Sequence, residues 1–138
     1  MRASRVEIVA CETCGGAARE ISGERRGAIL LRHIQRARET RNRETGDAVG
    51  IDIVSVRCLW ACTRSCAVML RSSGRVGYVV ADLEPNDESA RGLLDYAALY
   101  VASEDGSVPY KLWPPVLKGH FLCRIPLTLD SPNPEREP

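Results

Sequence analysis

Alternation of apolar and polar residues predicts two similar strands in the first half of the chain. "RVEIVA" (5–10) alternates into an apolar run that is typical of a strand, and "IDIVSVRC" (51–58) follows the same pattern. Between them, apolar residues recur near a helical stripe over residues 24–41, with charges on the other face. The chain therefore starts as β-α-β, with a cysteine at the end of each strand.

The next segment predicts a hairpin followed by a helix. "AVMLRSSGRVGYVVADL" (67–83) has two apolar runs around a turn at Gly74. Asn86 or Asp87 is placed to cap a helix over residues 90–103. The positions expected to face inward on this helix are Leu93, Leu94, Ala97 and Val101. The expected fold class is α/β, with element order β-α-β-β-α.

Beyond residue 105 the chain becomes rich in proline, since seven of its eight prolines lie there. We expect a domain over residues 1–105, an ordered Pro-rich C-terminal extension over 106–130 that packs on it, and a flexible tail over 131–138. The extension has apolar residues expected to be buried: Trp113, Leu117, Phe121 and Leu122.

Composition excludes several classes of partner. The 138 residues carry a net charge of +1, which points to no class of charged ligand. Residues 19–44 hold eight arginines against four glutamates, but no aromatic residues are interleaved to stack bases, so we expect no nucleic-acid partner. This patch would instead suit an acidic redox partner.

The N-terminus lacks an apolar signal region and no segment approaches about 20 apolar residues, which predicts no membrane contact and a cytoplasmic location.

Five of the six cysteines form two short groups. Cys11 and Cys14 follow the first predicted strand, and Cys58, Cys62 and Cys66 follow the second. If the two strands lie side by side, both groups meet at one edge of the sheet. Cytoplasmic thiols stay reduced, so clustered cysteines indicate metal or redox chemistry. Soft thiolates select zinc, copper(I) or iron–sulfur.

The remaining candidate ligands have simpler interpretations. Cys123 lies in the apolar stretch "HFLCRIP", where burial as a small hydrophobic side chain is expected. His33 is predicted in mid-helix and His120 in the extension, so each is expected to be an ordinary surface or packed histidine.

The cysteine segments resemble the thioredoxin-like [2Fe-2S] ferredoxins, which share the β-α-β-β-α order. "VAC" ending at Cys11 matches the first ligand of that family, "CLWAC" (58–62) matches its second pair, and the hairpin follows. The resemblance covers roughly residues 5–103 and implies a thioredoxin-like sheet and a [2Fe-2S] cluster for electron transfer with a redox protein partner. Two departures are the short gap between Cys11 and Cys14 and the presence of Cys66.

The whole chain also resembles a family of small bacterial proteins described only as predicted metal-binding. These carry the Cys-x2-Cys and Cys-x3-Cys-x3-Cys groups and an extension with Trp and Pro that ends near "RIP". Such proteins are often encoded near cobalamin-biosynthesis or metal-chaperone genes. This resemblance implies a non-enzymatic metal-binding or redox role, with a metal chaperone as an alternative partner.

Four thiolates complete a [2Fe-2S] site, and five candidates exist. The resemblance assigns Cys58, Cys62 and Cys11, and we expect Cys14 as the fourth because its glycine-bearing loop can curl back toward the metal. Cys66 is the alternative ligand. It begins a strand, whose pleat fixes the direction of its side chain.

Three further alternatives stay open at this point. The same thiols suit a structural or delivery zinc site. Cys11 and Cys14 would also suit a thiol–disulfide oxidoreductase, although such enzymes place a proline where Ser65, Cys66 and Ala67 stand. Oligomeric state is not indicated by the sequence, and a homodimer is one alternative.

Overall fold

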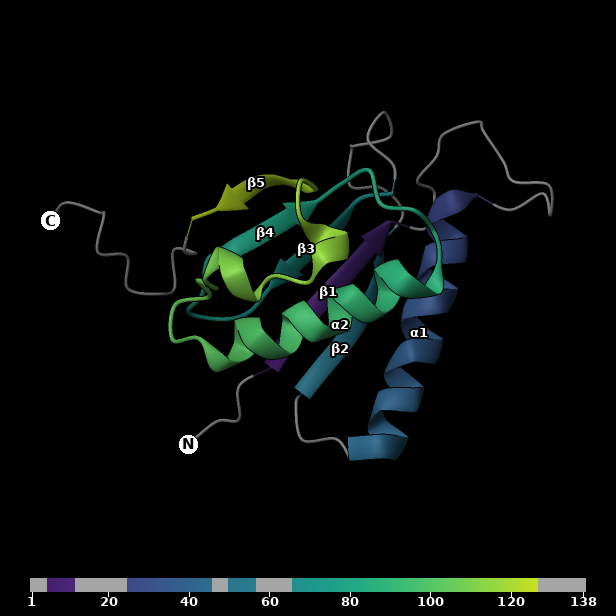
Figure 1. Ribbon diagram of the computed structural model, residues 1–138, viewed down its shortest axis with the longest axis horizontal. Coiled ribbons are helices and arrows are strands. Elements are labelled where there is room, and N and C mark those ends of the chain that lie inside the picture. The colour runs from purple at the N-terminus through teal and green to yellow at the C-terminus, as the bar shows by residue number, and fades with distance from the viewer. Residues whose placement is uncertain (1–4, 12–24, 46–49, 57–65, 127–138) are drawn as a thin grey trace, which may run out of the picture.

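The computed structural model describes residues 5–11, 25–45, 50–56 and 66–126, which form a mixed sheet with two helices (Figure 1). The elements in chain order are β1 (Arg5–Cys11), α1 (Arg26–Thr45), β2 (Gly50–Val56), β3 (Val68–Arg71), β4 (Gly77–Val80), α2 (Asp87–Ala102), the short 3-10 helices η2 (Tyr110–Leu112) and η3 (Pro115–Leu117), and β5 (Phe121–Ile125). The predicted α/β class and the order β-α-β-β-α are confirmed, and β5 is an additional strand that the sequence pattern did not predict.

The sheet has the strand order β2-β1-β3-β4-β5. β1 pairs in parallel with β2, and every other neighbouring pair is antiparallel. β1 therefore lies inside the sheet, with strands on both sides, and its residues from Ile8 to Cys11 are all buried. This explains why its second half is a continuous apolar run.

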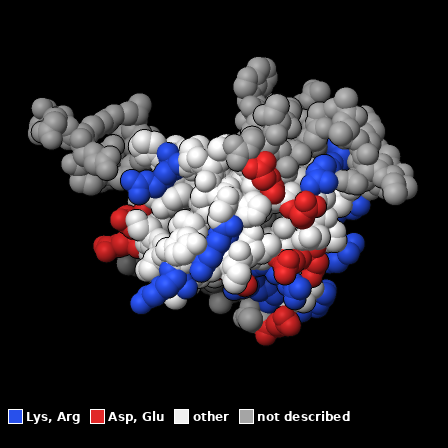
Figure 2. All heavy atoms as spheres, turned by 45° about the horizontal axis from the view of Figure 1, so that its top comes forward, with Lys and Arg blue, Asp and Glu red and all other residues white. Residues whose placement is uncertain are grey.

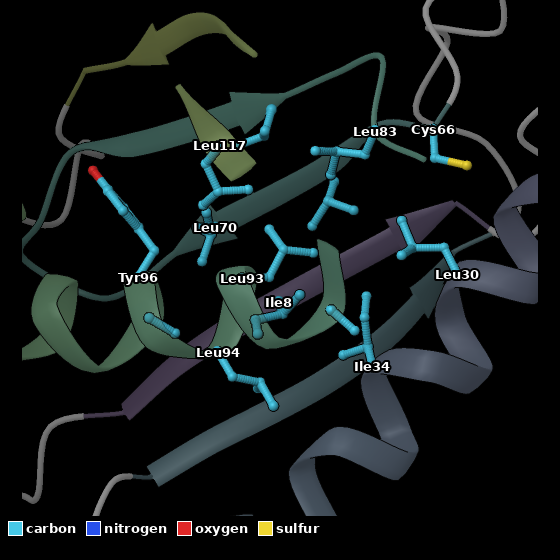
Figure 3. Close-up of a cluster of buried hydrophobic side chains, with 14 of the residues drawn as sticks. Ile8, Leu30, Ile34, Cys66, Leu70, Leu83, Leu93, Leu94, Tyr96 and Leu117 are labelled. Carbon is cyan, nitrogen blue, oxygen red and sulfur yellow. The ribbon is translucent and has the colours of Figure 1, made fainter. Parts of the chain in front are cut away.

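Both helices pack on the same face of the sheet. Leu30 and Ile34 of α1 and Leu93 of α2 join Ile8 of β1 in one buried cluster (Figure 3). The helical stripes read from the sequence are thus the surfaces that meet the sheet. Of the positions expected to face inward on α2, Leu93, Leu94 and Ala97 are fully buried and Val101 is half-buried.

Helix α2 is capped where the sequence predicts, although it begins at Asp87, three residues before the expected start. The side-chain oxygen of Asn86 accepts a hydrogen bond from the backbone N–H of Ser89 at 2.9 Å, which satisfies one of the open donors of the first turn. Asp87 and Glu88 place negative charge beside the positive end of the helix dipole. The cap is Asn86, and Asp87 is the first helical residue.

The arginines of α1 are partly matched by carboxylates of neighbouring elements. Arg26 lies 3.5 Å from Glu84, and Arg41 lies 2.8 Å from Asp95 of α2. On the right of Figure 2, the side where α1 lies, basic and acidic side chains are intermingled, whereas the middle of that face is largely uncharged. The surface on this side of the molecule therefore carries mixed charge, although arginines outnumber glutamates in the sequence of residues 19–44.

The extension is built into the core through an aromatic cluster. Its Trp113 and Phe121 have ring centroids 4.3 Å apart, and Phe121 lies 5.1 Å from Tyr96 of α2. Tyr100 continues the cluster, and its hydroxyl donates to the carbonyl of Val76 at 2.7 Å. Burial raises the pKa of Tyr100 to about 12, above its ordinary value near 10.

The burial expected in the extension is confirmed for Leu117 and wrong for Leu122. Leu117 is fully buried, and Trp113 and Phe121 are half-buried. Leu122 is 41% exposed; it is skipped by the register shift between β4 and β5, and β5 is the last strand of the sheet that the described residues form. No helix among the described residues is long and apolar enough to cross a membrane.

Gly92 allows the extension to approach α2 closely. A Cβ at this position would overlap Cγ1 of Val116 and would also touch Leu117 and Pro114. The absence of a side chain at Gly92 is therefore what lets η3 lie against the helix, although glycine is a poor helix former.

We predict that Gly92→Ala lowers the free energy of unfolding. The gain in helix propensity is about 1 kcal/mol, and overpacking against the stiff Val116 side chain costs about 1–3 kcal/mol. Urea denaturation followed by circular dichroism measures the balance. The double variant Gly92→Ala/Val116→Ala should be more stable than the sum of the two single changes implies. An increase in stability for Gly92→Ala alone would contradict the packing argument.

Candidate metal centre

One edge of the sheet brings together the strand ends that adjoin the two cysteine groups. Cys11, the last residue of β1, pairs with Val56, the last residue of β2. On the other side of β1, Ala10 pairs with Val68, the first residue of β3. We call this side of the sheet, where β1 and β2 end and β3 begins, the cysteine edge.

Cys11 is held inside the sheet at this edge. Its residue surface is 2% exposed, and it belongs to the buried cluster between the sheet and the helices. Strand pairing on the β2 side fixes its backbone. A thiol in this position has a defined direction and little contact with water.

Cys66 lies two residues before β3 begins, so the expectation that it begins a strand is wrong. It is fully buried, and Figure 3 shows its side chain next to that of Leu83. Its backbone N–H donates to the carbonyl of Leu83 and its carbonyl accepts from the Leu83 N–H, both at 3.2 Å. This backbone pair, rather than the expected strand, therefore fixes the direction of the Cys66 side chain.

The pair of Cys66 with Leu83 depends on an irregularity that the sequence analysis missed. Val68 pairs with Val80, so regular pairing would continue from Cys66 to Asp82. The observed partner of Cys66 is Leu83, one residue further on. Asp82, which is skipped, has a left-handed backbone with φ of 59°. Asp adopts a left-handed backbone more readily than most residues, so Asp82 is the one feature of the local sequence that could have indicated this irregularity.

The other three candidate ligands, Cys14, Cys58 and Cys62, lie outside the described residues. Among residues 5–11, 25–45, 50–56 and 66–126, no three His, Cys, Asp or Glu side chains gather as a metal site requires. The described part of the chain thus contributes Cys11 and the alternative ligand Cys66 to the cysteine edge, and the ligand set stays a prediction.

The expected burial of Cys123 is wrong. This residue is exposed, in the middle of β5 and opposite Val79 of β4. Within the stretch "HFLCRIP", Phe121 packs inward on Tyr96. Cys123, two residues later on the outermost strand β5, is open to solvent. It lies on the strand furthest from β1 on that side of the sheet.

The two histidines are partly buried within the fold. His120 precedes β5, and its Nδ1 lies 2.9 Å from the carbonyl oxygen of Ala81. His33 lies in α1, and its Nδ1 is buried without a hydrogen-bond partner. His120 is therefore a packed histidine, as the sequence predicts.

Comparison with known families identifies the chain at the level of a family. A family model described as "Protein of unknown function (DUF1636)" matches residues 8–127. The chain belongs to the DUF1636 family. The matched range contains both cysteine groups and extends through β5, so the extension is part of what defines this DUF1636 protein. No curated protein and no solved structure matches the chain.

We predict that alanine substitution at the exposed Cys123 and at the buried Cys66 has different effects on the free energy of unfolding. Cys123→Ala should change the free energy of unfolding by less than about 0.5 kcal/mol, because it is a surface substitution. Cys66→Ala, at a fully buried position, should cost about 1 kcal/mol or more through the space that it leaves. Urea denaturation of both variants tests this. A larger loss for Cys123→Ala would show that this thiol has a structural or metal-binding role.

Proposed function

We propose that this DUF1636 protein binds a [2Fe-2S] cluster through Cys11, Cys14, Cys58 and Cys62 and acts in electron transfer or metal handling. A tetrathiolate site with two irons exchanges one electron when the cluster is bound. The partner is a redox protein or a metal chaperone. The link to chaperone or cobalamin pathways rests on the sequence resemblance alone.

The observation that carries the proposal is the pairing of Cys11 with Val56 at the cysteine edge. Cys14 follows Cys11 by three residues, and Cys58 follows Val56 by two. Two residues of extended chain span at most about 7 Å. The parallel register of β1 and β2 therefore starts both cysteine-bearing segments from neighbouring positions, as a site with ligands from two loops requires.

The arrangement of elements supports the resemblance to thioredoxin-like ferredoxins. A parallel β1–β2 pair, an antiparallel β3–β4 hairpin and two helices on one face are the parts that the resemblance implies. We therefore propose a thioredoxin-like core with β5 as an addition from the extension. The donor set suits the cluster, since thiolates are the usual ligands of iron–sulfur centres.

Cys66 is less suited than Cys14 to complete the site. Its backbone is bonded in both directions to Leu83, and it is fully buried, in the same cluster as Cys11. Ligation by Cys66 would draw a core side chain toward the metal. We therefore keep Cys14 as the fourth ligand and Cys66 as the alternative.

The thiol–disulfide alternative is less well supported than metal binding. Thiols that exchange disulfides are partly exposed and lie near a helix N-terminus, where the thiolate is stabilised. Cys11 is 2% exposed, which does not suit a thiol that must meet a partner's disulfide. A zinc site on the same four thiols stays as the second candidate, because zinc accepts the same tetrathiolate set.

We predict that protein purified without oxygen after iron-replete expression contains about two irons and two sulfides per chain, following the tetracysteinate pattern. Its visible absorption should bleach on reduction with dithionite. Elemental analysis and the spectrum measure this directly. A colourless protein with one zinc per chain would contradict the iron–sulfur proposal and support the zinc candidate.

Single substitutions at the clustered cysteines test the ligand set. Serine at Cys11, Cys14, Cys58 or Cys62 should abolish or strongly shift the visible spectrum, because an oxygen ligand replaces a thiolate. Cys66→Ser should leave the spectrum nearly unchanged, and Cys66→Ala serves as a control that adds no buried hydroxyl. If both Cys66 variants lose iron while Cys14→Ser keeps it, the ligands are Cys11, Cys58, Cys62 and Cys66.

A further inference from the structure

The ordered extension carries an unbalanced positive charge. Residues 106–126 contain Lys111, Lys118 and Arg124 and no Asp or Glu, and the two lysines are the only ones in the chain. Within the described part of the chain, no carboxylate forms an ion pair with any of these three side chains. This distinguishes them from Arg26 and Arg41 of α1, which have carboxylate partners.

The same segment presents large apolar side chains to solvent. Tyr110 is 60% exposed, Leu112 is 50% exposed and Leu122 is 41% exposed. Among the described residues, these are the exposed large hydrophobic side chains, and all three lie between residues 110 and 122. Single exposed apolar residues are common, but their restriction to one segment that also lacks negative charge is informative.

Contacts within the extension hold this surface in a defined shape. The ring centroids of Tyr110 and Trp113 are 4.9 Å apart, and Trp113 packs on Phe121 at 4.3 Å. Nζ of Lys118 lies 4.6 Å from the Tyr110 ring centroid, in a cation–π contact. The indole N–H of Trp113 donates to the carbonyl of Val108 at 2.9 Å. We call the side chains that this support presents the extension patch: the exposed Tyr110, Lys111, Leu112, Leu122 and Arg124, and the half-buried Lys118.

The strand β5, which carries Leu122 and Arg124 of the extension patch, begins toward the cysteine edge. Phe121, at the start of β5, is opposite Val80, which in turn is opposite Val68 at the start of β3. β5 therefore begins at the same edge of the sheet as β3. Two strand spacings separate them, which is about 10 Å.

We infer that the extension patch docks an acidic protein partner, with Tyr110 and Leu112 as apolar anchors and Lys111, Lys118 and Arg124 as the cations that orient it. Complementary charge speeds encounter and sets orientation, and exposed aromatic and aliphatic side chains supply contact area. A second copy of this chain is a poor occupant, because each copy would bring three unpaired cations to the interface. That this partner exchanges electrons or metal at the cysteine edge rests on the proposed function.

Binding of a synthetic acidic peptide tests the docking surface. The probe is a fluorescein-labelled peptide of 12 residues made of Glu and Leu, titrated onto the full-length protein with anisotropy as the readout. Peptides with Lys in place of Glu, or Ser in place of Leu, are the controls. We expect the Glu/Leu peptide to bind at least ten times more tightly than either control, and more weakly as salt increases.

Two substitutions at exposed positions locate the binding surface. Lys111→Glu and Leu112→Ser should each weaken binding of the Glu/Leu peptide at least tenfold. Arg36→Glu, a matched charge reversal at an exposed position of α1, should change it less than twofold. Absence of binding, or equal losses for Lys111→Glu and Arg36→Glu, would overturn the inference.

Two further measurements distinguish other occupants. Phosphatidylserine vesicles that bind through Lys111 and Leu112, with no binding of the Glu/Leu peptide, would identify a membrane-binding surface and overturn the inference. A dimer in size-exclusion chromatography that Leu112→Ser converts to a monomer would identify a second copy as the occupant and overturn it as well. None of these readouts depends on bound metal, so a failure of the cluster proposal is recognised separately.

Discussion

β1 pairs in parallel with β2 and antiparallel with β3, and the positions of both cysteine groups follow from this double pairing. Because Cys11 is opposite Val56 and Ala10 is opposite Val68, the strand ends next to each group lie at one edge. A shift of one residue in either register would turn the affected strand's side chains to the opposite face, exposing the apolar ones. The buried residues of β1 therefore maintain the geometry on which a shared metal site depends.

Burial has different consequences for the two described thiols of the cysteine edge. Cys11 ends a strand whose chain continues directly toward Cys14, so it can hold one side of a site between two loops. Cys66 is bound by its backbone to Leu83 and packs in the core, so its contribution to stability competes with a role as ligand. Cys11 belongs to the same buried cluster, so the backbone pair with Leu83 is the feature behind our proposal that Cys66 is not a ligand.

The extension connects the core to the surface that we propose for docking. Gly92 admits η3 against α2, and Phe121 links the ring of Tyr96 to the start of β5. The exposed side chains of the extension patch thus stand on buried neighbours rather than on a loose tail. A partner bound there would be held in a reproducible position against the same sheet that carries the cysteine edge.

Local patterns in the sequence were sufficient for β1, α1, β2, the hairpin and α2 with its Asn86 cap, because periodicity and capping depend on neighbours along the chain. They also predicted that a cysteine group follows each of the first two strands, whereas the pairing of these strands was only a condition that the structure meets. The strand β5, the exposure of Cys123 and Leu122, and the pairing of Cys66 with Leu83 were decided by the tertiary structure. An apolar stretch has the same composition whether its strand lies inside a sheet or at its edge, and only long-range pairing determines which of its side chains are covered.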